Sequence, residues 1–139
     1  MVQAEDAPLG YLLYRVAAVL RPEVSAVLGP IGLTLPEFVC LRLLSLSPGL
    51  SSAELSRHVS VTPQAMNTVL RKLEDLGAVA RPETVSSGRA LPATLTPHGC
   101  ELLKRAESAV HEADAHILGK LTPSQQRKFK RLLEKLGSD

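Results

Sequence analysis

The chain has 139 residues, a size typical of one domain with its own core. Hydrophobic residues make up 45% of it and charged residues 22%, as in an ordinary globular protein. Its formal charge of only +2 argues against a protein that coats DNA by charge alone. The low aromatic content, 3%, argues against a protein that stacks single-stranded bases on aromatic rings.

The sequence shows no pattern for export, membrane insertion or cysteine cross-linking. Its N-terminus, MVQAEDAPLG, has acidic residues where a signal peptide has basic ones. No uncharged apolar stretch reaches the roughly 18 residues that a membrane span needs. Cys40 and Cys100 are too few and too far apart for a disulfide framework or a paired-cysteine metal site. We therefore expect a protein of the reducing cytoplasm that does not enter membranes.

Helix-starting signals recur along the chain. Thr62 and Thr96 each precede a proline, which predicts a hydroxyl cap followed by proline at the first helical position. Asp6 is the expected cap of the first helix. Three further segments match the capping box, in which a hydroxyl and a Glu or Gln bond reciprocally to backbone amides; they begin at Thr34, Ser51 and Thr122. Six helix starts predict a mainly α-helical fold.

Apolar periodicity gives the expected course of the helices. The first carries an apolar stripe from Leu9 to Val27, and Pro22 predicts a kink near Arg21 or two shorter helices. The next helix is apolar nearly all round, which predicts burial on most sides. Gly77 is the expected terminator of the fourth helix. After the first helix, the expected helices span about 35–46, 52–59, 63–76, 97–118 and 123–136.

A small hairpin interrupts the helical series. Residues 78–85 and 90–95 are the expected strands around a polar tip, and Pro82 and Pro92 restrict them to an edge hairpin. The element order is therefore α-α-α-α-β-β-α-α. Two short helices joined by a three-residue turn and followed by a hairpin predict a winged helix-turn-helix.

The helix at 63–76 has two different faces. Its apolar face is expected to pack against Leu55, Val59 and Val61, and consists of Met66, Val69, Leu70, Leu73 and Leu76. The opposite face is short and polar, as a helix that enters the major groove requires. Glutamine and asparagine can pair with adenine, and an arginine can reach a base or a phosphate. The expected DNA contacts on this helix are Gln64, Ala65, Asn67, Thr68 and Arg71.

Three further residues complete the predicted DNA-binding set. Backbone amides at the helix starts near Ser51 and Thr62 can bind phosphate without a charged side chain. Arg89, at the tip of the hairpin, suits a narrow minor groove. A merely solvated helix face would explain the polar residues alone, but not together with the helix pair and the hairpin.

Residues 34–99 resemble the MarR family of bacterial transcriptional regulators. The matching segments are LTLPEFVCLRLL, LSRHVSVTPQAMNTVLRKLEDLGAVAR and ATLTPHG, and the flanking helices agree in number and order. The resemblance implies a homodimer that binds a palindromic operator in double-stranded DNA. It also implies repression that is relieved by a small, often phenolic, ligand or by oxidation. Within a single domain, 1–139, it implies dimerisation helices at about 6–33 and 97–139 and a DNA-binding lobe at about 34–96.

The sequence departs from the family pattern at the hairpin tip. There the family commonly has Asp-x-Arg, whereas this chain has Ser87-Gly88-Arg89, so the arginine lacks its acidic partner. Basic residues around the fourth helix are also sparse. Both departures favour the alternative of a winged-helix adaptor that binds proteins and not DNA.

The first helix offers candidate ligand contacts. Tyr11, Tyr14 and Arg15 lie off its main apolar stripe and could line a pocket for an anionic effector, since arginine pairs with carboxylates. Cys40 is a further candidate. An ordinary helix flank at the dimer interface explains Tyr11, Tyr14 and Arg15 at least as well.

The cysteines and histidines suggest two other kinds of site, a redox-active thiol and a zinc site. Cys100 lies at the first turn of a helix, where the dipole favours a reactive thiolate, whereas Cys40 is expected to be buried and inert. A redox-sensing regulator that acts through Cys100 or Cys40 is an alternative. His111 and His116 are five positions apart and so point about 140° apart, which does not fit a zinc motif. No catalytic constellation can be assembled. We expect no metal, no cofactor and no enzymatic activity.

Overall fold

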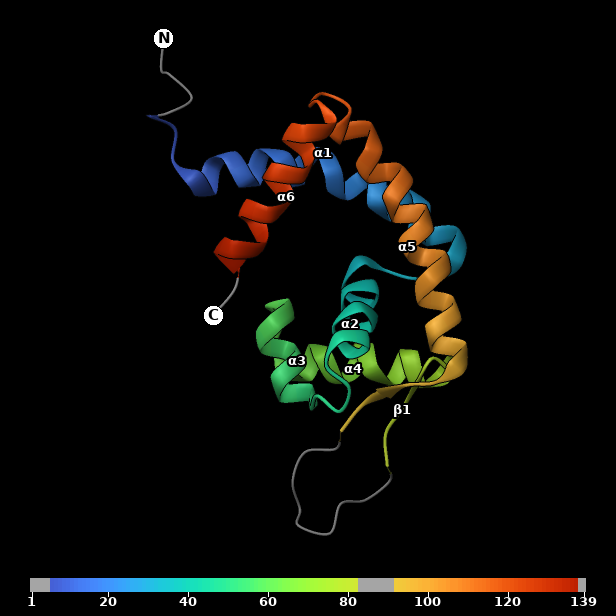
Figure 1. Cartoon of the computed structure of the whole chain (residues 1–139). Helices are drawn as coiled ribbons and strands as arrows, with labels where there is room; N and C mark the ends of the chain where they lie inside the picture. The colour runs from blue at the N-terminus through green and yellow to red at the C-terminus, as the bar shows by residue number, and fades with distance from the viewer. Residues whose placement is uncertain (1–5, 83–91, 138–139) are drawn as a thin grey trace.

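The computed structural model describes residues 6–82 and 92–137. Figure 1 shows helices α2, α3 and α4 gathered with the hairpin at one end, and α1 and α6 at the other. Helix α5 runs from the hairpin to the end that holds α1 and α6. The elements are α1 (Leu9–Leu28), the 3-10 turn η2 (Gly29–Ile31), α2 (Leu35–Leu46), α3 (Ser52–Val59), α4 (Pro63–Asp75), β1 (Val79–Ala80), β2 (Thr94–Leu95), α5 (Pro97–Leu118) and α6 (Pro123–Gly137).

Five of the six predicted helix starts are confirmed. Thr34 and Ser51 form capping boxes with the glutamates three positions on, and Thr122 does so with Gln125. The hydroxyls of Thr62 and Thr96 accept hydrogen bonds from amides in their first helical turns. The cap predicted at Asp6 is wrong, because Pro8 takes the capping position and no side chain bonds there.

Helix α1 continues without a break through Pro22. A proline removes one backbone hydrogen bond, but a helix that packs along another element can tolerate this loss. Helix α1 packs along α5, where Val24 and Leu28 are buried. The alternative of two shorter helices is therefore wrong.

The antiparallel hairpin is confirmed, with Val79 opposite Leu95 and Ala80 opposite Thr94. Its described strands are shorter than predicted, because Arg81, Pro82 and Pro92 lie outside them. A proline has no amide hydrogen to donate to a strand ladder. The intervening residues 83–91, Arg89 among them, lie outside the described part of the chain.

One apolar core holds the α2–α4 lobe, the hairpin base and α5 together. On α4, Met66, Leu70 and Leu73 are fully buried, as predicted, and Val69 is half-buried. The prediction that Leu76 belongs to the same buried face is wrong, because Leu76 is the C-terminal cap of the helix and is 40% exposed.

Helix α5 starts in direct contact with the hairpin base. The amide of Thr96 donates to the Ala78 carbonyl over 3.0 Å. A Cβ atom added at Gly99 would lie 2.0 Å from the same carbonyl oxygen, so only glycine permits this approach. The base of the hairpin is thereby held directly against the start of α5.

No single helix in the described ranges is long and apolar enough to cross a membrane. The segments Leu9–Ile31 and Leu35–Leu46 meet that criterion only when taken together, and they bend by 79° where they join.

Candidate functional site

Helices α3 and α4 form the predicted helix-turn-helix. After Val59 the chain turns through Ser60, whose φ of 58° lies in the left-handed region, a conformation that only a few per cent of non-glycine residues adopt. The amide of Val61 bonds back to the Ser56 carbonyl over 3.2 Å. The hydroxyl of Thr62 then starts α4 by accepting from the Ala65 amide over 3.0 Å.

Helix α4 presents a polar face to solvent. Gln64, Ala65, Thr68 and Arg71 are exposed, and Asn67 is half-buried. The Thr68 hydroxyl donates to the Gln64 carbonyl, one turn back. The structure thus brings the five contact residues predicted on this helix to the side of α4 that faces away from the core, with Asn67 at its half-buried edge.

The two helix starts predicted to bind phosphate, at Ser51 and Thr62, differ in the acidic groups near their amides. At Ser51 the Glu54 carboxylate already accepts from the backbone amide over 3.2 Å, and this bond holds the pKa of Glu54 below its usual range. A phosphate there would meet a negative charge. Helix α4 has no acidic residue in its first turn, so the helix start at Thr62 is the better anion site.

Two ion pairs attach α4 to its neighbours. Lys72 Nζ lies 3.0 Å from Glu37 Oε1, and that carboxylate also accepts from the Thr34 amide. On the other side, Arg81 Nη2 lies 2.7 Å from Glu74 Oε1. Neither pair was predicted from the sequence. A lysine and a glutamate 35 positions apart give no local signal, although Glu37 could be assigned to a capping box.

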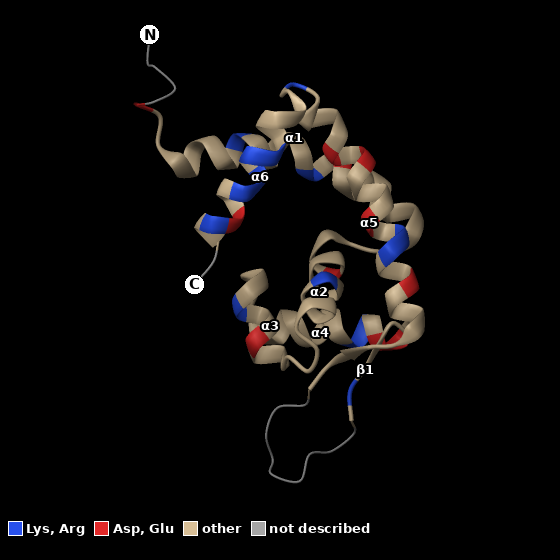
Figure 2. Ribbon diagram, viewed as in Figure 1, with Lys and Arg blue, Asp and Glu red and all other residues tan. Residues whose placement is uncertain are grey.

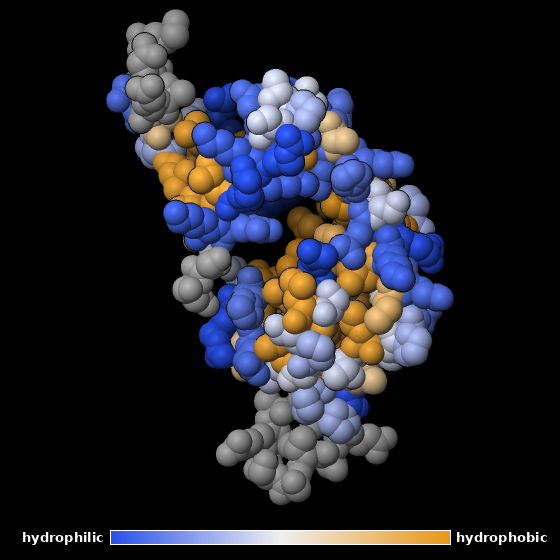
Figure 3. All heavy atoms as spheres, viewed as in Figure 1, coloured by the Kyte–Doolittle hydropathy of each residue, from blue (hydrophilic) through white to orange (hydrophobic). Residues whose placement is uncertain are grey.

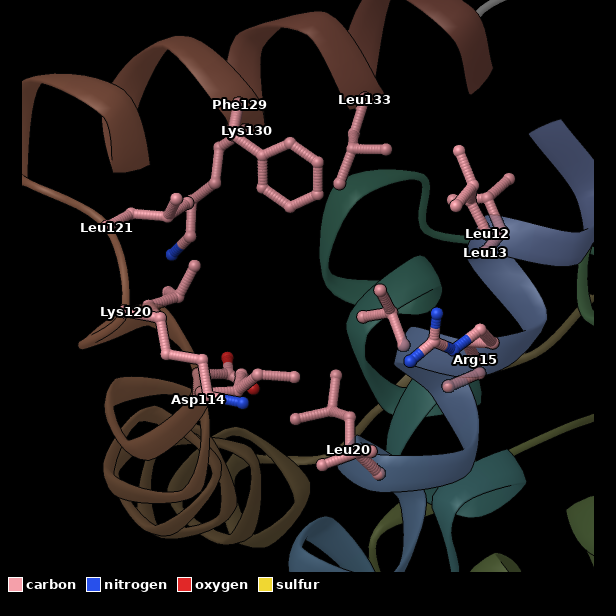
Figure 4. Close-up of a pocket in the computed structure, with 15 residues that line it drawn as sticks. Leu12, Leu13, Arg15, Leu20, Asp114, Lys120, Leu121, Phe129, Lys130 and Leu133 are labelled. Atoms are coloured by element: carbon pink, nitrogen blue, oxygen red, sulfur yellow. The ribbon is translucent and has the colours of Figure 1, made fainter. Parts of the chain in front are cut away.

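A large apolar groove lies between α1, the end of α5 and α6. Its volume is about 860 Å³. In Figure 4, Phe129 and Leu133 project from α6 into the space that faces Leu20 of α1. Figure 3 shows hydrophobic residues at the surface beside the hollow that separates the two ends of the molecule. The groove also has polar members, namely Arg15, Asp114, Lys120 and Lys130.

The structure does not bring the four predicted ligand residues together. Arg15 lines the groove, whereas the exposed Tyr11 and Tyr14 do not. The Arg15 guanidinium lies 5.9 Å from the centre of the Tyr11 ring, at the edge of cation–π range. Cys40 is fully buried in the core and lines neither this groove nor the smaller pocket described next.

A smaller and more polar pocket of about 270 Å³ lies between α2, α5 and α6. Arg42 and Glu107 form an ion pair at its border, with Nη1 2.6 Å from Oε2. Burial raises the pKa of Asp114 above its usual range, although the positive charge of Lys130 opposes the shift. The other lining residues are Phe38, Val110 and His111.

The cysteines and histidines have different surroundings. Burial, aided by the negative charge of Glu37, raises the pKa of Cys40 from 9.0 to about 12, which makes the thiol inert as expected. Cys100 is exposed. His116 Nδ1 lies 2.6 Å from Glu23 Oε1 and so joins α5 to α1. No metal-binding cluster occurs within residues 6–82 and 92–137.

Positive charge is not concentrated on the helix-turn-helix. Figure 2 shows several Lys and Arg residues along α6 and few on α3 and α4. Across residues 51–95 there are five basic and four acidic residues. Any phosphate binding by this lobe must therefore depend on few side chains and on helix starts.

Comparisons with known proteins agree with this architecture. The MarR family pattern matches residues 33–91. The HTH-type transcriptional repressor Rv2887 of Mycobacterium tuberculosis is 78% identical over 136 residues, which cover 98% of each chain. The crystal structure of Rv2887 with DNA has a TM-score of 0.81 at 74% identity and covers 96% of this chain and 100% of that one. Its complex with salicylic acid has a TM-score of 0.80 at 77% identity, with coverage of 96% and 99%. The winged helix-turn-helix fold, the helix pair and the similarity along almost the whole sequence show that the chain belongs to the MarR family.

Proposed function

We propose that the protein is a homodimeric repressor that binds a palindromic operator and is released by a small aromatic acid. The observation that carries this proposal is the exposed polar face of α4. The opposite face of this helix is apolar and packs in the core, and the helix begins at a hydroxyl cap. A helix of this kind can enter the major groove with base-reading side chains foremost. The DNA complex of the 78%-identical repressor supports the same function.

The expected DNA contacts are the residues predicted from the sequence. Gln64, Asn67 and Arg71 would read base edges, with Ala65 and Thr68 beside them. The helix start at Thr62 would bind phosphate, and that at Ser51 would do so less well because of Glu54. Arg89 would reach the minor groove from the hairpin tip.

The dimer would form through α1, α5 and α6, leaving residues 34–96 as the DNA-binding lobe of a single-domain chain. Apolar side chains on α1 and α6 are exposed in the single chain, including Leu9, Leu13, Leu132 and Leu136. Exposed apolar patches of this kind mark interaction surfaces. A partner chain would also fill the large groove. In the dimer the two α4 helices would lie about 34 Å apart, one turn of duplex.

The effector would bind in the smaller pocket. This pocket lies between α2 of the DNA-binding lobe and α5 and α6 of the dimerisation region. A ligand there can therefore change the position of the lobe relative to the dimerisation region. Its volume suits a single aromatic ring. Arg42 and Lys130 would receive a carboxylate, and Phe38 would contact the ring. The relative's complexes with salicylic and p-aminosalicylic acid support this ligand class.

Arg15 is a second candidate for the carboxylate, because it lines the large groove and Lys130 lines both hollows. The same groove is the proposed dimer contact, so a ligand at Arg15 would have to share it with the partner chain. Substituting Arg15 and Arg42 separately distinguishes the two positions.

The function is tested by selecting duplexes from random-sequence DNA with the protein and then measuring their affinity by fluorescence anisotropy. A repressor enriches a palindrome and binds it far more tightly than a scrambled duplex. Failure to enrich any sequence would favour the alternative of a winged-helix adaptor for proteins. Adding salicylate to the bound complex then tests the effector.

A further inference from the structure

We propose that the two ion pairs of α4 set its rotation about its own axis, so that Glu37 and Arg81 act as positioning residues for base reading. The inference rests on the proposed function. Neither residue lies on the reading face, and each acts through a side chain of α4.

The helical positions of the two pairs lead to this proposal. At about 100° per residue, Gln64, Thr68 and Arg71 lie within a sector of about 60°. Asn67 lies about 40° beyond one edge of that sector, on the side of Glu74, and Ala65 about 60° beyond the other edge, on the side of Lys72. Lys72 and Glu74 lie about 80° to either side of the centre of that sector. The pairs therefore attach opposite flanks of the same helix, and a rotation of α4 in either direction would strain one of them.

The first flank is attached to the start of α2. Glu37 is 5% exposed, and its Oε1 accepts both from the Thr34 amide, over 2.8 Å, and from Lys72, over 3.0 Å. The capping box fixes this carboxylate, because it is also the third residue of α2. Lys72 thus bonds to a buried, fixed group at the start of α2.

The second flank is attached to the base of the hairpin. Arg81 follows β1 directly, and its Nε and Nη2 both approach Glu74 Oε1, at 2.8 and 2.7 Å. The Arg81 side chain is only 16% exposed. The hairpin base is itself fixed, since Thr96 bonds to the backbone of both Gly77 and Ala78.

Neither pair is needed to hold α4 in the core. Met66, Leu70 and Leu73 are fully buried and supply that attachment. Burial of one apolar face sets the rotation of a helix only approximately, because the apolar contacts include no directional bonds. Hydrogen-bonded ion pairs on the flanks are directional and so supply what the apolar face lacks.

The test is a double variant, Glu37→Gln with Arg81→Gln, measured against the selected duplex and a scrambled duplex of the same composition. It leaves the sequence of α4 unchanged, and it removes one negative and one positive charge. The amide oxygen of glutamine can still accept from the Thr34 amide. The matched control is Glu101→Gln with Lys104→Gln, which makes the same charge change at exposed positions of α5.

We expect the ratio of selected to scrambled affinity to fall about tenfold in the double variant. Affinity for scrambled DNA and the salt dependence should stay unchanged, because no phosphate contact is lost. The conservative variant Arg81→Lys should retain most of the discrimination, and the α5 control should retain all of it. Circular dichroism at the assay temperature verifies folding; if the double variant unfolds, the Arg81→Gln variant alone is used, with a proportionally smaller loss.

A folded variant whose discrimination changes by less than about twofold would overturn the inference. Equal loss of affinity for both duplexes would overturn it too, because that result indicates a lost phosphate contact. If the wild-type protein itself does not discriminate, the proposed function fails, and that result is seen before any variant is compared.

Discussion

Nη1 of Arg42 lies 2.6 Å from Oε2 of Glu107 and joins α2 of the lobe to α5, across 65 positions of sequence. Both side chains are partly exposed and border the smaller pocket. A carboxylate that enters this pocket competes with Glu107 for the guanidinium. Binding of an aromatic acid would thereby loosen the lobe from α5, and the coupling between effector and DNA would be reciprocal.

The Arg42→Ala variant should lose its response to salicylate. In the wild-type protein, saturating salicylate should weaken DNA binding by about 5- to 150-fold. Because the variant lacks the Arg42–Glu107 pair from the start, its affinity for DNA without salicylate should already be reduced, and salicylate should weaken it little further. The loss of folding stability should be no more than about 1 kcal/mol because the pair is exposed. Anisotropy titrations with and without salicylate measure the DNA affinities, and urea denaturation measures the folding stability. Arg15→Ala is the matched comparison. If only that variant loses its response to salicylate, the effector binds in the large groove and not in the smaller pocket.

The Gly99→Ala variant should be destabilised by about 3 kcal/mol, because its Cβ would overlap the Ala78 carbonyl oxygen and force α5 away from the hairpin base. Urea denaturation followed by circular dichroism measures this loss. Gly10→Ala in α1 is the control, since nothing lies within 4 Å of an added Cβ there. A control that loses as much stability as Gly99→Ala would contradict the steric explanation.

The two cysteines should react differently with a thiol reagent. Cys40 is buried and has a pKa of about 12, so only the exposed Cys100 should be modified in the folded protein. A chromogenic disulfide reagent should find one thiol in the native state and two in denaturant. The folded Cys100→Ser variant should show no reactive thiol. Rapid modification of Cys40 in the native variant would contradict the burial that the structure shows.

The same pKa shift predicts a pH dependence of folding stability. The pKa of Cys40 is raised in the folded state, so its contribution is fully present below pH 9.0 and is lost between pH 9.0 and about 12. In that window the unfolded chain releases a proton that the folded chain retains. The free energy of unfolding should fall by about 1.4 kcal/mol per pH unit from this group. Cys40→Ala should lack that part of the slope.

Operator affinity should depend only weakly on salt. Residues 51–95 carry five basic and four acidic side chains, so few counterions are released on binding, even by two copies of the lobe. The logarithm of the affinity, plotted against the logarithm of the salt concentration, gives the number released. A slope that corresponds to about ten or more ions would contradict the reliance on helix starts and a few arginines.

Local signals predicted the helices well. Capping hydroxyls and N-terminal prolines placed the starts of α2, α3, α4 and α5 correctly, and Gly77 placed the end of α4 to within one residue, because these signals act within one turn of the helix end. The failures have physical causes. Asp6 is displaced by Pro8, and Leu76 lies at a helix cap where the core ends.

The tertiary contacts could not be predicted in the same way. The pairs Arg42–Glu107 and Lys72–Glu37 join residues 65 and 35 positions apart, and their formation depends on how the helices cross. The sequence also placed Arg15 off the apolar stripe of α1 but could not show that the tyrosines near it do not line the groove. The DNA contacts themselves remain predictions from the polar face of α4.

The central claim is that α4 reads DNA, and it is tested most directly by fluorescence anisotropy of Arg71→Ala on the selected duplex. Arg71 is exposed on the reading face and makes no contribution to the buried face of the helix. Loss of a base or phosphate contact should cost about 1–3 kcal/mol, or roughly tenfold or more in affinity, with the fold intact by circular dichroism. Arg89→Ala should also weaken binding. Unchanged affinity in both variants would contradict the account.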